Sequence, residues 1–201
     1  MNQNGDFQIW FHDSVIGKLN PNWGIQISQE FRFGNDATEL YQQFNEVMLI
    51  YYGGPSVEIS PGYKQLYSKE YQKKSKWVTF CIPQLDLKFI FQDRSWKLEN
   101  RNRIEYVLAS QKRNSHLWVL RPLFNLDTPF YYKNRGIKFF LSDEFFWTEG
   151  RGINQNRLKV GFKFQAGKHT LFATSYLLRN LKRFHNWTHQ NVLHLSIDFN
   201  F

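Results

Sequence analysis

Lysine, glutamate and arginine occupy every second position over residues 97–105. Side chains at this spacing share one face of an extended strand. Facing Glu and Arg side chains can pair across neighbouring strands, which neutralises charges that are costly to bury alone. A ring of Arg and Lys can instead select small anions in a pore. The residues that we expect in such an ion-pair network or constriction are Glu30, Arg32, Glu99, Arg101, Arg103, Glu105, Arg121, Glu144, Arg157 and Lys159.

A second candidate chemistry lies near the end of the chain, where His194, Ser196 and Asp198 alternate and share one face. Serine and histidine are residues of nucleophilic catalysis. No recognisable nucleophile motif surrounds the serines, and three polar residues on one strand more often line a barrel. We therefore assign no catalytic residue, and a lipid-modifying enzyme of the phospholipase or acyltransferase type stays an alternative.

The sequence predicts no metal site and no cofactor. His185 and His189 stand four residues apart without a third ligand, whereas a zinc ion needs three or four. The single cysteine, Cys81, excludes an internal disulfide and a cysteine cluster. The formal charge of +9 would suit nucleic acid, but the basic residues alternate with acidic ones. Because no basic stripe forms, we expect no nucleic-acid partner.

The elements that must position these residues are β-strands. Aromatic residues make up 18% of the chain, and alanine, the best helix former, is scarce. Apolar and polar residues alternate in many segments, which is the period of a strand. The segments of this kind are residues 6–17, 23–33, 39–52, 56–68, 78–92, 96–108, 116–127, 137–148, 155–165, 169–180 and 191–201.

These segments predict an all-β, antiparallel up-and-down transmembrane β-barrel, formed by residues 1–201 as a single domain. No apolar run approaches the ~20 residues of a spanning helix, whereas tilted membrane strands need about 9–11. We find eleven segments, but single-chain bacterial barrels have an even number of strands. We therefore favour twelve strands over ten, and we place the missing strand in residues 128–136, which are long for a turn.

Alternation alone does not say which face points inward. A soluble barrel that binds a ligand buries its apolar face, and a membrane barrel exposes it to lipid. Charges of both signs occur in mid-strand on the polar face, and the opposite face is almost uncharged. This division favours a membrane barrel with a narrow, charged lumen, and a soluble basic ligand-binding β-barrel stays the alternative.

The connections between the expected strands differ in length. Residues 53–55, 93–95 and 166–168 look like short turns, whereas residues 69–77, 109–116, 149–155 and 181–190 look like longer polar loops. Short turns on one side and long loops on the other are typical of outer-membrane barrels. Because Lys and Arg pair well with phosphate, we expect outer-membrane lipid and lipopolysaccharide as partners of the basic loops. These basic residues are Lys73, Lys74, Lys76, Lys112, Arg113, Lys182 and Arg183.

The two ends of the sequence bear on location. The last strand carries an apolar residue at every second position, in a pattern similar to the signal that the outer-membrane barrel assembly machinery reads. The residues of this signal would be Leu195, Ile197, Phe199 and Phe201. Residues 1–6 lack the features of a signal peptide, so we expect a mature chain, monomeric and located in the bacterial outer membrane.

Several short segments, in order along nearly the whole chain, carry a family resemblance. They are PGYK at 61–64, ENRNRIEY at 99–106, LRPL at 120–123, SDEFF at 142–146 and NRLKVGF at 156–162, followed by the final strand. Together they resemble the bacterial family called domain of unknown function 2490, whose members are thought to be outer-membrane β-barrels. The resemblance implies a fold and a location, but no established activity.

The sequence thus predicts an outer-membrane β-barrel that acts as a minor channel for small solutes, including anions, or as a structural protein of the envelope. It gives no positive indication of an enzyme. The alternatives are the lipid-modifying enzyme and the soluble ligand-binding barrel described above.

Overall fold

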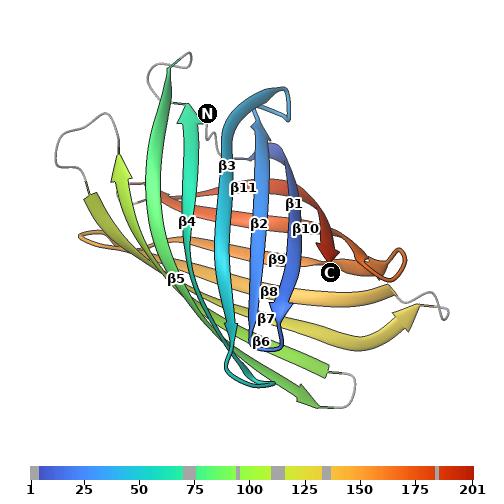
Figure 1. The fold of residues 1–201 in the computed structure, drawn as a ribbon. Helices are drawn as coiled ribbons and strands as arrows, with labels where there is room; N and C mark the ends of the chain where they lie inside the picture. Colours follow the sequence, from blue (N-terminus) through green and yellow to red (C-terminus); the bar gives the residue numbers. More distant parts are fainter. Residues whose placement is uncertain (1–4, 70–75, 94–95, 110–115, 133–136, 184–185) are drawn as a thin grey trace.

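In a computed structural model, the chain forms a closed β-barrel of eleven strands (Figure 1). The structure describes residues 5–69, 76–93, 96–109, 116–132, 137–183 and 186–201. The strands are β1 (Asp6–Asn20), β2 (Trp23–Gly34), β3 (Glu39–Tyr52), β4 (Val57–Lys69), β5 (Trp77–Asp93), β6 (Trp96–Ala109), β7 (His116–Tyr132), β8 (Ile137–Thr148), β9 (Gly152–Gln165), β10 (Thr170–Arg183) and β11 (Asn186–Asn200). The described residues form no helix, so the all-β prediction is confirmed.

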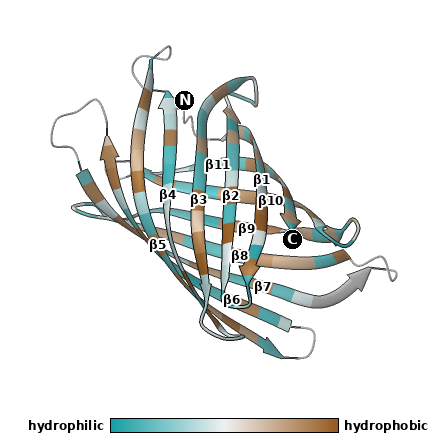
Figure 2. Cartoon of the chain, viewed as in Figure 1, coloured by the Kyte–Doolittle hydropathy of each residue, from teal (hydrophilic) through white to brown (hydrophobic). Residues whose placement is uncertain are grey.

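Alternating side chains give the barrel a polar inside and an apolar outside. On β9, Arg157 and Lys159 line the lumen, whereas Leu158 and Val160 are 42% and 53% exposed on the outer surface. Figure 2 shows the same division as hydrophilic and hydrophobic bands that alternate along the strands. No membrane-spanning helix is found in the part of the chain that the structure describes.

The expectation of twelve strands is wrong, and so is the alternative of ten. All eleven segments found by alternation correspond to strands, with ends that differ by a few residues. Residues 128–136 hold no separate strand in their described part, because Thr128–Tyr132 continue β7. A register shift between Asp127 and Tyr131, where β7 pairs with β8, interrupts the alternation that would have revealed this extension.

An odd number of strands changes how the barrel closes. Strands that alternate in direction leave the first and the eleventh running the same way, so β1 and β11 pair in parallel. Their register runs from Asp6 opposite Gln190 to Ile16 opposite Asn200. The other pairs of neighbouring strands are antiparallel, as the up-and-down prediction requires.

The barrel has two rims. At the loop rim, β1 begins and β2 leads into β3, β4 into β5, β6 into β7, β8 into β9 and β10 into β11. At the opposite turn rim, Phe201 continues the β1–β11 pairing: its amide donates to the carbonyl of Ile16 at 2.8 Å, and the amide of Lys18 donates to its carbonyl at 2.9 Å.

Two of the expected long loops are wrong. β9 already begins at Gly152, and β10 and β11 pair as far as Arg183 opposite Asn186. Two of the polar residues that suggested loops, Gln155 and Gln190, are in fact buried strand residues that face the barrel interior.

Candidate functional site

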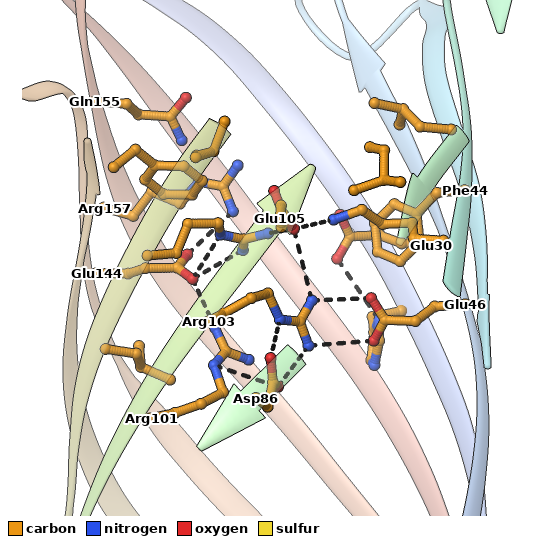
Figure 3. Close-up of a pocket in the computed structure, with 18 of the residues that line it drawn as sticks. Glu30, Phe44, Glu46, Asp86, Arg101, Arg103, Glu105, Glu144, Gln155 and Arg157 are labelled. Atoms are coloured by element: carbon orange, nitrogen blue, oxygen red, sulfur yellow. Dashed lines mark hydrogen bonds and ion pairs between the residues drawn. The ribbon is translucent and has the colours of Figure 1, made fainter. Parts of the chain in front are cut away.

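All ten charged residues expected in a network or constriction line one cavity in the lumen. Its volume is about 670 Å³, and each of the eleven strands contributes to its wall. The residues labelled in Figure 3 converge on it from opposite sides of the barrel. The wall carries nine Lys and Arg residues and seven Asp and Glu residues. The lumen is therefore strongly ionic, with a small excess of positive charge.

Arg103 of β6 holds one part of the network together. Its Nε donates to Asp86 Oδ1 of β5 at 2.6 Å, and its Nη1 donates to Glu46 Oε2 of β3 at 2.9 Å. Asp86 lies directly opposite Arg103 in the β5–β6 register, but Glu46 belongs to a strand three places away. Arg103 thus crosses the lumen, and its side chain is only 7% exposed.

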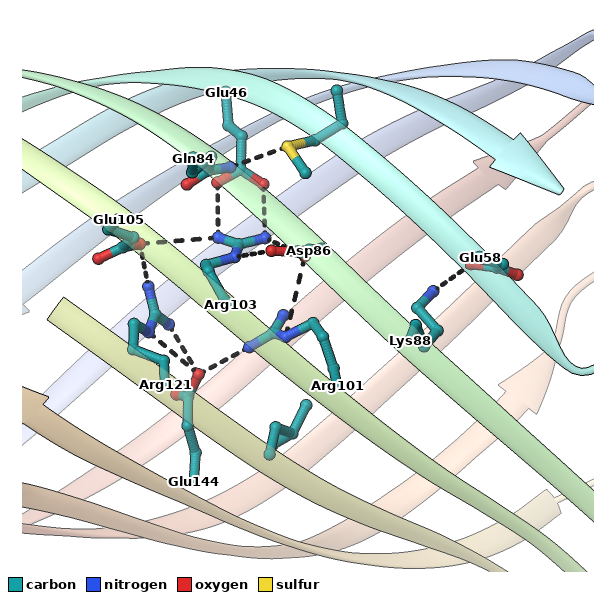
Figure 4. A network of polar contacts seen from close by, with 12 residues as sticks. Glu46, Glu58, Gln84, Asp86, Lys88, Arg101, Arg103, Glu105, Arg121 and Glu144 are labelled. Atoms are coloured by element: carbon teal, nitrogen blue, oxygen red, sulfur yellow. Dashed lines mark hydrogen bonds and ion pairs between the residues drawn. The ribbon is translucent and has the colours of Figure 1, made fainter. Parts of the chain in front are cut away.

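Glu144 of β8 is the second centre of the network (Figure 4). It accepts from Arg101 at 2.7 Å, from Arg121 at 2.8 Å and from Arg157 at 3.3 Å. Arg121 also donates to Glu105 at 2.5 Å, and Lys64 of β4 pairs with the same carboxylate. The ion pairs therefore connect strands β4 to β9, with β3 joined through Arg103.

These charges stabilise the barrel only as a set. Moving an isolated charge out of water costs several kcal/mol, and attraction to a close partner offsets that cost when the geometry is good. Removing a single partner leaves the other charge buried and uncompensated. Each member of the network therefore depends on the presence of its partners.

Three expected members, Glu30, Glu99 and Lys159, differ from the others in their contacts. Glu30 pairs with Arg32 on the same strand, and it also lies 3.6 Å from His12 and 3.7 Å from His194. Glu99 lies 3.5 Å from Lys97, near the turn-rim end of β6. Lys159 lines the cavity but has no Asp or Glu partner among the described residues.

An aromatic platform that the sequence analysis missed lies in the same lumen. The Trp10 ring is 1% exposed, and the guanidinium carbons of Arg32, Arg157 and Arg179 lie 4.0, 5.1 and 5.5 Å from its centroid. Guanidinium groups at such distances gain from cation–π attraction. Trp10 and Arg179 sit in the same alternating pattern as the expected residues, so their positions on inward faces were the available signal.

Glu46 was also missed. It follows Asn45 and precedes a long apolar run, residues 47–52, in which alternation is hidden by apolar side chains on both faces. In the structure, Met48 and Ile50 of this run are buried and line the cavity with Glu46.

The candidate catalytic residues His194, Ser196 and Asp198 line the lumen, and the structure does not combine them into a triad. Asp198 accepts a hydrogen bond from Ser14 at 2.6 Å, and His194 approaches Glu30. Within the described residues, Ser196 makes no hydrogen bond to His194. A serine without a base at hydrogen-bond distance is not activated as a nucleophile.

The histidine pair gives no metal centre among the described residues. His185 lies outside them, and Nδ1 of His189 contacts the side-chain oxygen of Asn180 at 2.6 Å. The part of the chain that the structure describes holds no group of three residues that could bind a metal ion.

The outer face carries two carboxylates within its apolar surface. Asp13, the central residue of β1, accepts from Gln29 at 2.9 Å, and Asp143 of β8 accepts from Asn156. Each is thus paired with an amide on the neighbouring strand. Around them the exposed side chains are large and apolar over all strands, including Phe11, Leu141 and Phe162.

The basic residues expected in loops are only partly described. Lys76 and Lys182 are exposed, and both lie at the loop rim. Arg183 is the last residue of β10, and its side chain lies outside the description together with all of Lys73, Lys74, Lys112 and Arg113. The residues of the expected assembly signal lie on β11 and just after it: Leu195, Ile197, Phe199 and Phe201.

Comparison with known families gives one finding that covers most of the chain. The model of the family described as "Protein of unknown function (DUF2490)" matches residues 7–190. This match confirms the resemblance drawn from the short segments. A search of curated proteins finds no match.

Proposed function

This chain belongs to the family of proteins of unknown function DUF2490, and we propose that it is a narrow, charged channel for small solutes in the bacterial outer membrane. The observation that carries the proposal is the ionic cavity of about 670 Å³, to which all eleven strands contribute. A barrel that only needed a filled interior could fill it with apolar side chains, without the desolvation that charges impose.

The membrane location is supported by the outer surface. Large apolar side chains are exposed around the whole barrel, for example Phe11, Val160 and Leu87. Soluble monomers rarely expose apolar patches of more than a few hundred Å². Within this proposal, the alternation of β11 up to Phe201 serves the barrel assembly machinery, and the loop rim with Lys76 and Lys182 faces lipopolysaccharide.

The solutes that pass must be small. The contact of Arg103 with Glu46 crosses the lumen, and Arg179 of β10 reaches the hydroxyl of Tyr41 of β3 at 3.5 Å. The remaining space is a passage between ionic side chains. Its excess of Arg and Lys favours anions over cations.

Planar-bilayer recording of the refolded protein tests the channel. We expect small, anion-selective conductance steps, because the lumen wall carries excess positive charge. Replacing Arg101 and Arg103 by glutamine should shift the reversal potential in a salt gradient toward cation selectivity. A bilayer that contains heat-modifiable, folded barrel and shows no conductance would contradict the channel.

A structural role in the envelope is the second candidate, and a specific observation favours it. The ion pairs of Arg103 and Glu144 tie strands β3 to β9 together across the interior. Such a network would keep a barrel rigid even without transport. Absence of conductance, combined with loss of envelope integrity on deletion of the gene, would support this candidate.

A further inference from the structure

The charges of the lumen are not evenly balanced across it. On the side formed by β3 to β8, each cation that lines the cavity has a carboxylate partner: Lys64 with Glu105, Lys88 with Glu58, Arg101 and Arg121 with Glu144, and Arg103 with Glu46 and Asp86. The excess of positive charge therefore falls on the remaining wall, formed mainly by β9, β10, β1 and β2.

On that wall, the carboxylates are too few for the cations. Arg157 shares Glu144 with Arg101 and Arg121, and its Nε is buried without a hydrogen-bond partner. Arg32 pairs with Glu30. Arg179 donates hydrogen bonds to the side-chain oxygens of Gln155 and Gln190, at 3.3 and 3.2 Å.

Lys159 is the sharpest sign of an incomplete site. It lies two residues from Arg157 on the inward face of β9, it lines the cavity, and no Asp or Glu oxygen of the described residues is within ion-pair distance of its Nζ. An ammonium group is costly to hold in a partly buried place without a counter-charge. Lys64, which lines the cavity from β4, five strands away in the barrel, does have a counter-charge in Glu105.

The geometry of the arginines suits an oxyanion. The guanidinium carbons of Arg32 and Arg157 lie 4.0 and 5.1 Å from the ring centroid of Trp10, so cation–π attraction holds both groups against the indole. Guanidinium groups bind phosphate oxygens through two parallel N–H donors, and an ammonium adds a point charge. Arg157 shares the inward face of β9 with Lys159, and Arg32 contacts the same Trp10 ring as Arg157, so the two guanidinium groups and the ammonium together match a compact dianion.

We propose that Arg32, Arg157 and Lys159 form a binding site for a dianionic, phosphate-like oxyanion in the lumen. The proposal deepens the proposed channel function, since it names the class of solute and the place where it pauses. Binding itself does not require conduction, so the two can be tested apart.

The test measures phosphate binding to the refolded barrel in non-ionic detergent by isothermal titration calorimetry, at constant ionic strength set with sodium chloride. We expect saturable binding of inorganic phosphate. Lys159→Met should raise Kd at least tenfold, and Lys159→Arg should restore most of the affinity. Higher salt should weaken binding, because the attraction is electrostatic.

Lys163→Met is the matched control. Lys163 also lies on β9, but it pairs with Asp127 at 2.6 Å and does not line the cavity. Its loss should leave Kd unchanged, although it removes the same net charge. Heat-modifiable migration and circular dichroism would verify that each variant folds.

Three results would overturn the assignment. They are no phosphate binding by the folded wild type, an equal loss of affinity in Lys163→Met, and tighter binding of succinate than of phosphate. Conductance without phosphate binding would reject this site and leave the channel intact. Phosphate binding without conductance would reject the channel and leave the site intact.

Discussion

Arg103 shows how much one side chain can matter in an ionic interior. Its guanidinium is the shared partner of Glu46 and Asp86, both of which are buried. Without it, Glu46 would have no ion-pair partner among the described residues, and Asp86 would have only Arg101, at 3.9 Å. Glu144 is a similar case, because its carboxylate is shared by three arginines and its removal would leave all three with one partner fewer.

Replacing Arg103 by methionine should therefore destabilise the barrel by about 3–5 kcal/mol, the cost of breaking a buried ion pair from one side. Denaturant unfolding of the refolded protein in detergent measures the change. The triple variant with Glu46→Gln and Asp86→Asn should recover most of the stability, because no carboxylate is then left unpaired. A loss in the triple variant as large as in Arg103→Met would contradict the ionic explanation.

Asp13 allows a second test at the residue scale, on the outside of the barrel. It is the central residue of β1, it faces outward, and its partner Gln29 is neutral. A carboxylate in the middle of a lipid-facing surface is destabilising, and Asp13→Asn keeps a hydrogen-bonding group there. We expect a gain of up to about 2 kcal/mol in lipid vesicles.

The control for Asp13 is Asp93→Asn at the turn-rim end of β5, where the side chain is exposed. This change should leave the unfolding midpoint unmoved. If Asp13→Asn lowered stability in vesicles, Asp13 would have to meet a polar partner there in place of lipid.

The sequence predicted which charged residues line the lumen better than it predicted which of them form ion pairs with each other. Alternation alone put ten charged residues on the inward face, and all ten line one cavity. Which residue meets which depends on the curvature of the wall. For instance, Arg103 of β6 contacts Glu46 of β3, three strands away. The alternation within a strand does not predict a contact between strands that are not neighbours.

At the scale of strands, glycine marks a place where two strands pack unusually closely. A Cβ atom at Gly161 of β9 would collide with the carbonyl oxygen of Thr174 and the Cβ of Ser175 on β10. Both are atoms that a side-chain rotation cannot move. Gly161 and Ser175 are direct partners in the register of the two strands.

Gly161→Ala should accordingly destabilise the barrel by about 1–3 kcal/mol, the usual cost of overpacking. Gly17→Ala is the matched change, since a Cβ there would meet only Ile25 Cγ2 at 3.9 Å, an ordinary contact. Denaturant unfolding compares the two. Equal effects would show that the close approach of β9 and β10 does not constrain the residue at 161.

Strand positions could be predicted well from alternation, and strand ends less well. The ends of β9, β10 and β11 were misplaced because polar strand residues near the loop rim, among them the buried Gln155 and Gln190, resemble loop residues. The end of β7 was misplaced because an irregular register breaks its alternation. Both errors occur where the backbone is still a strand but apolar and polar side chains no longer alternate along it.

At the scale of the whole molecule, the number of strands was the main error. The rule of even numbers holds for barrels in which every pair is antiparallel, and it fails here because β1 and β11 pair in parallel. Parallel and antiparallel strands carry the same alternation, so side chains give no sign of this closure. The eleven alternating segments therefore gave the correct number of strands, and the even-number rule led to the wrong expectation of twelve.

The parallel closure has a consequence for sidedness. A barrel with an even number of strands begins and ends at the same rim, whereas here β1 begins at the loop rim and β11 ends at the turn rim. In the proposed membrane orientation, Gly5 would face the outside of the cell and Asn200 the periplasm. In a Cys81→Ser background, an impermeant maleimide should label Gly5→Cys on intact cells and reach Asn200→Cys only after the outer membrane is opened. Reporter tags at the two ends of such a barrel would thus sample two different compartments.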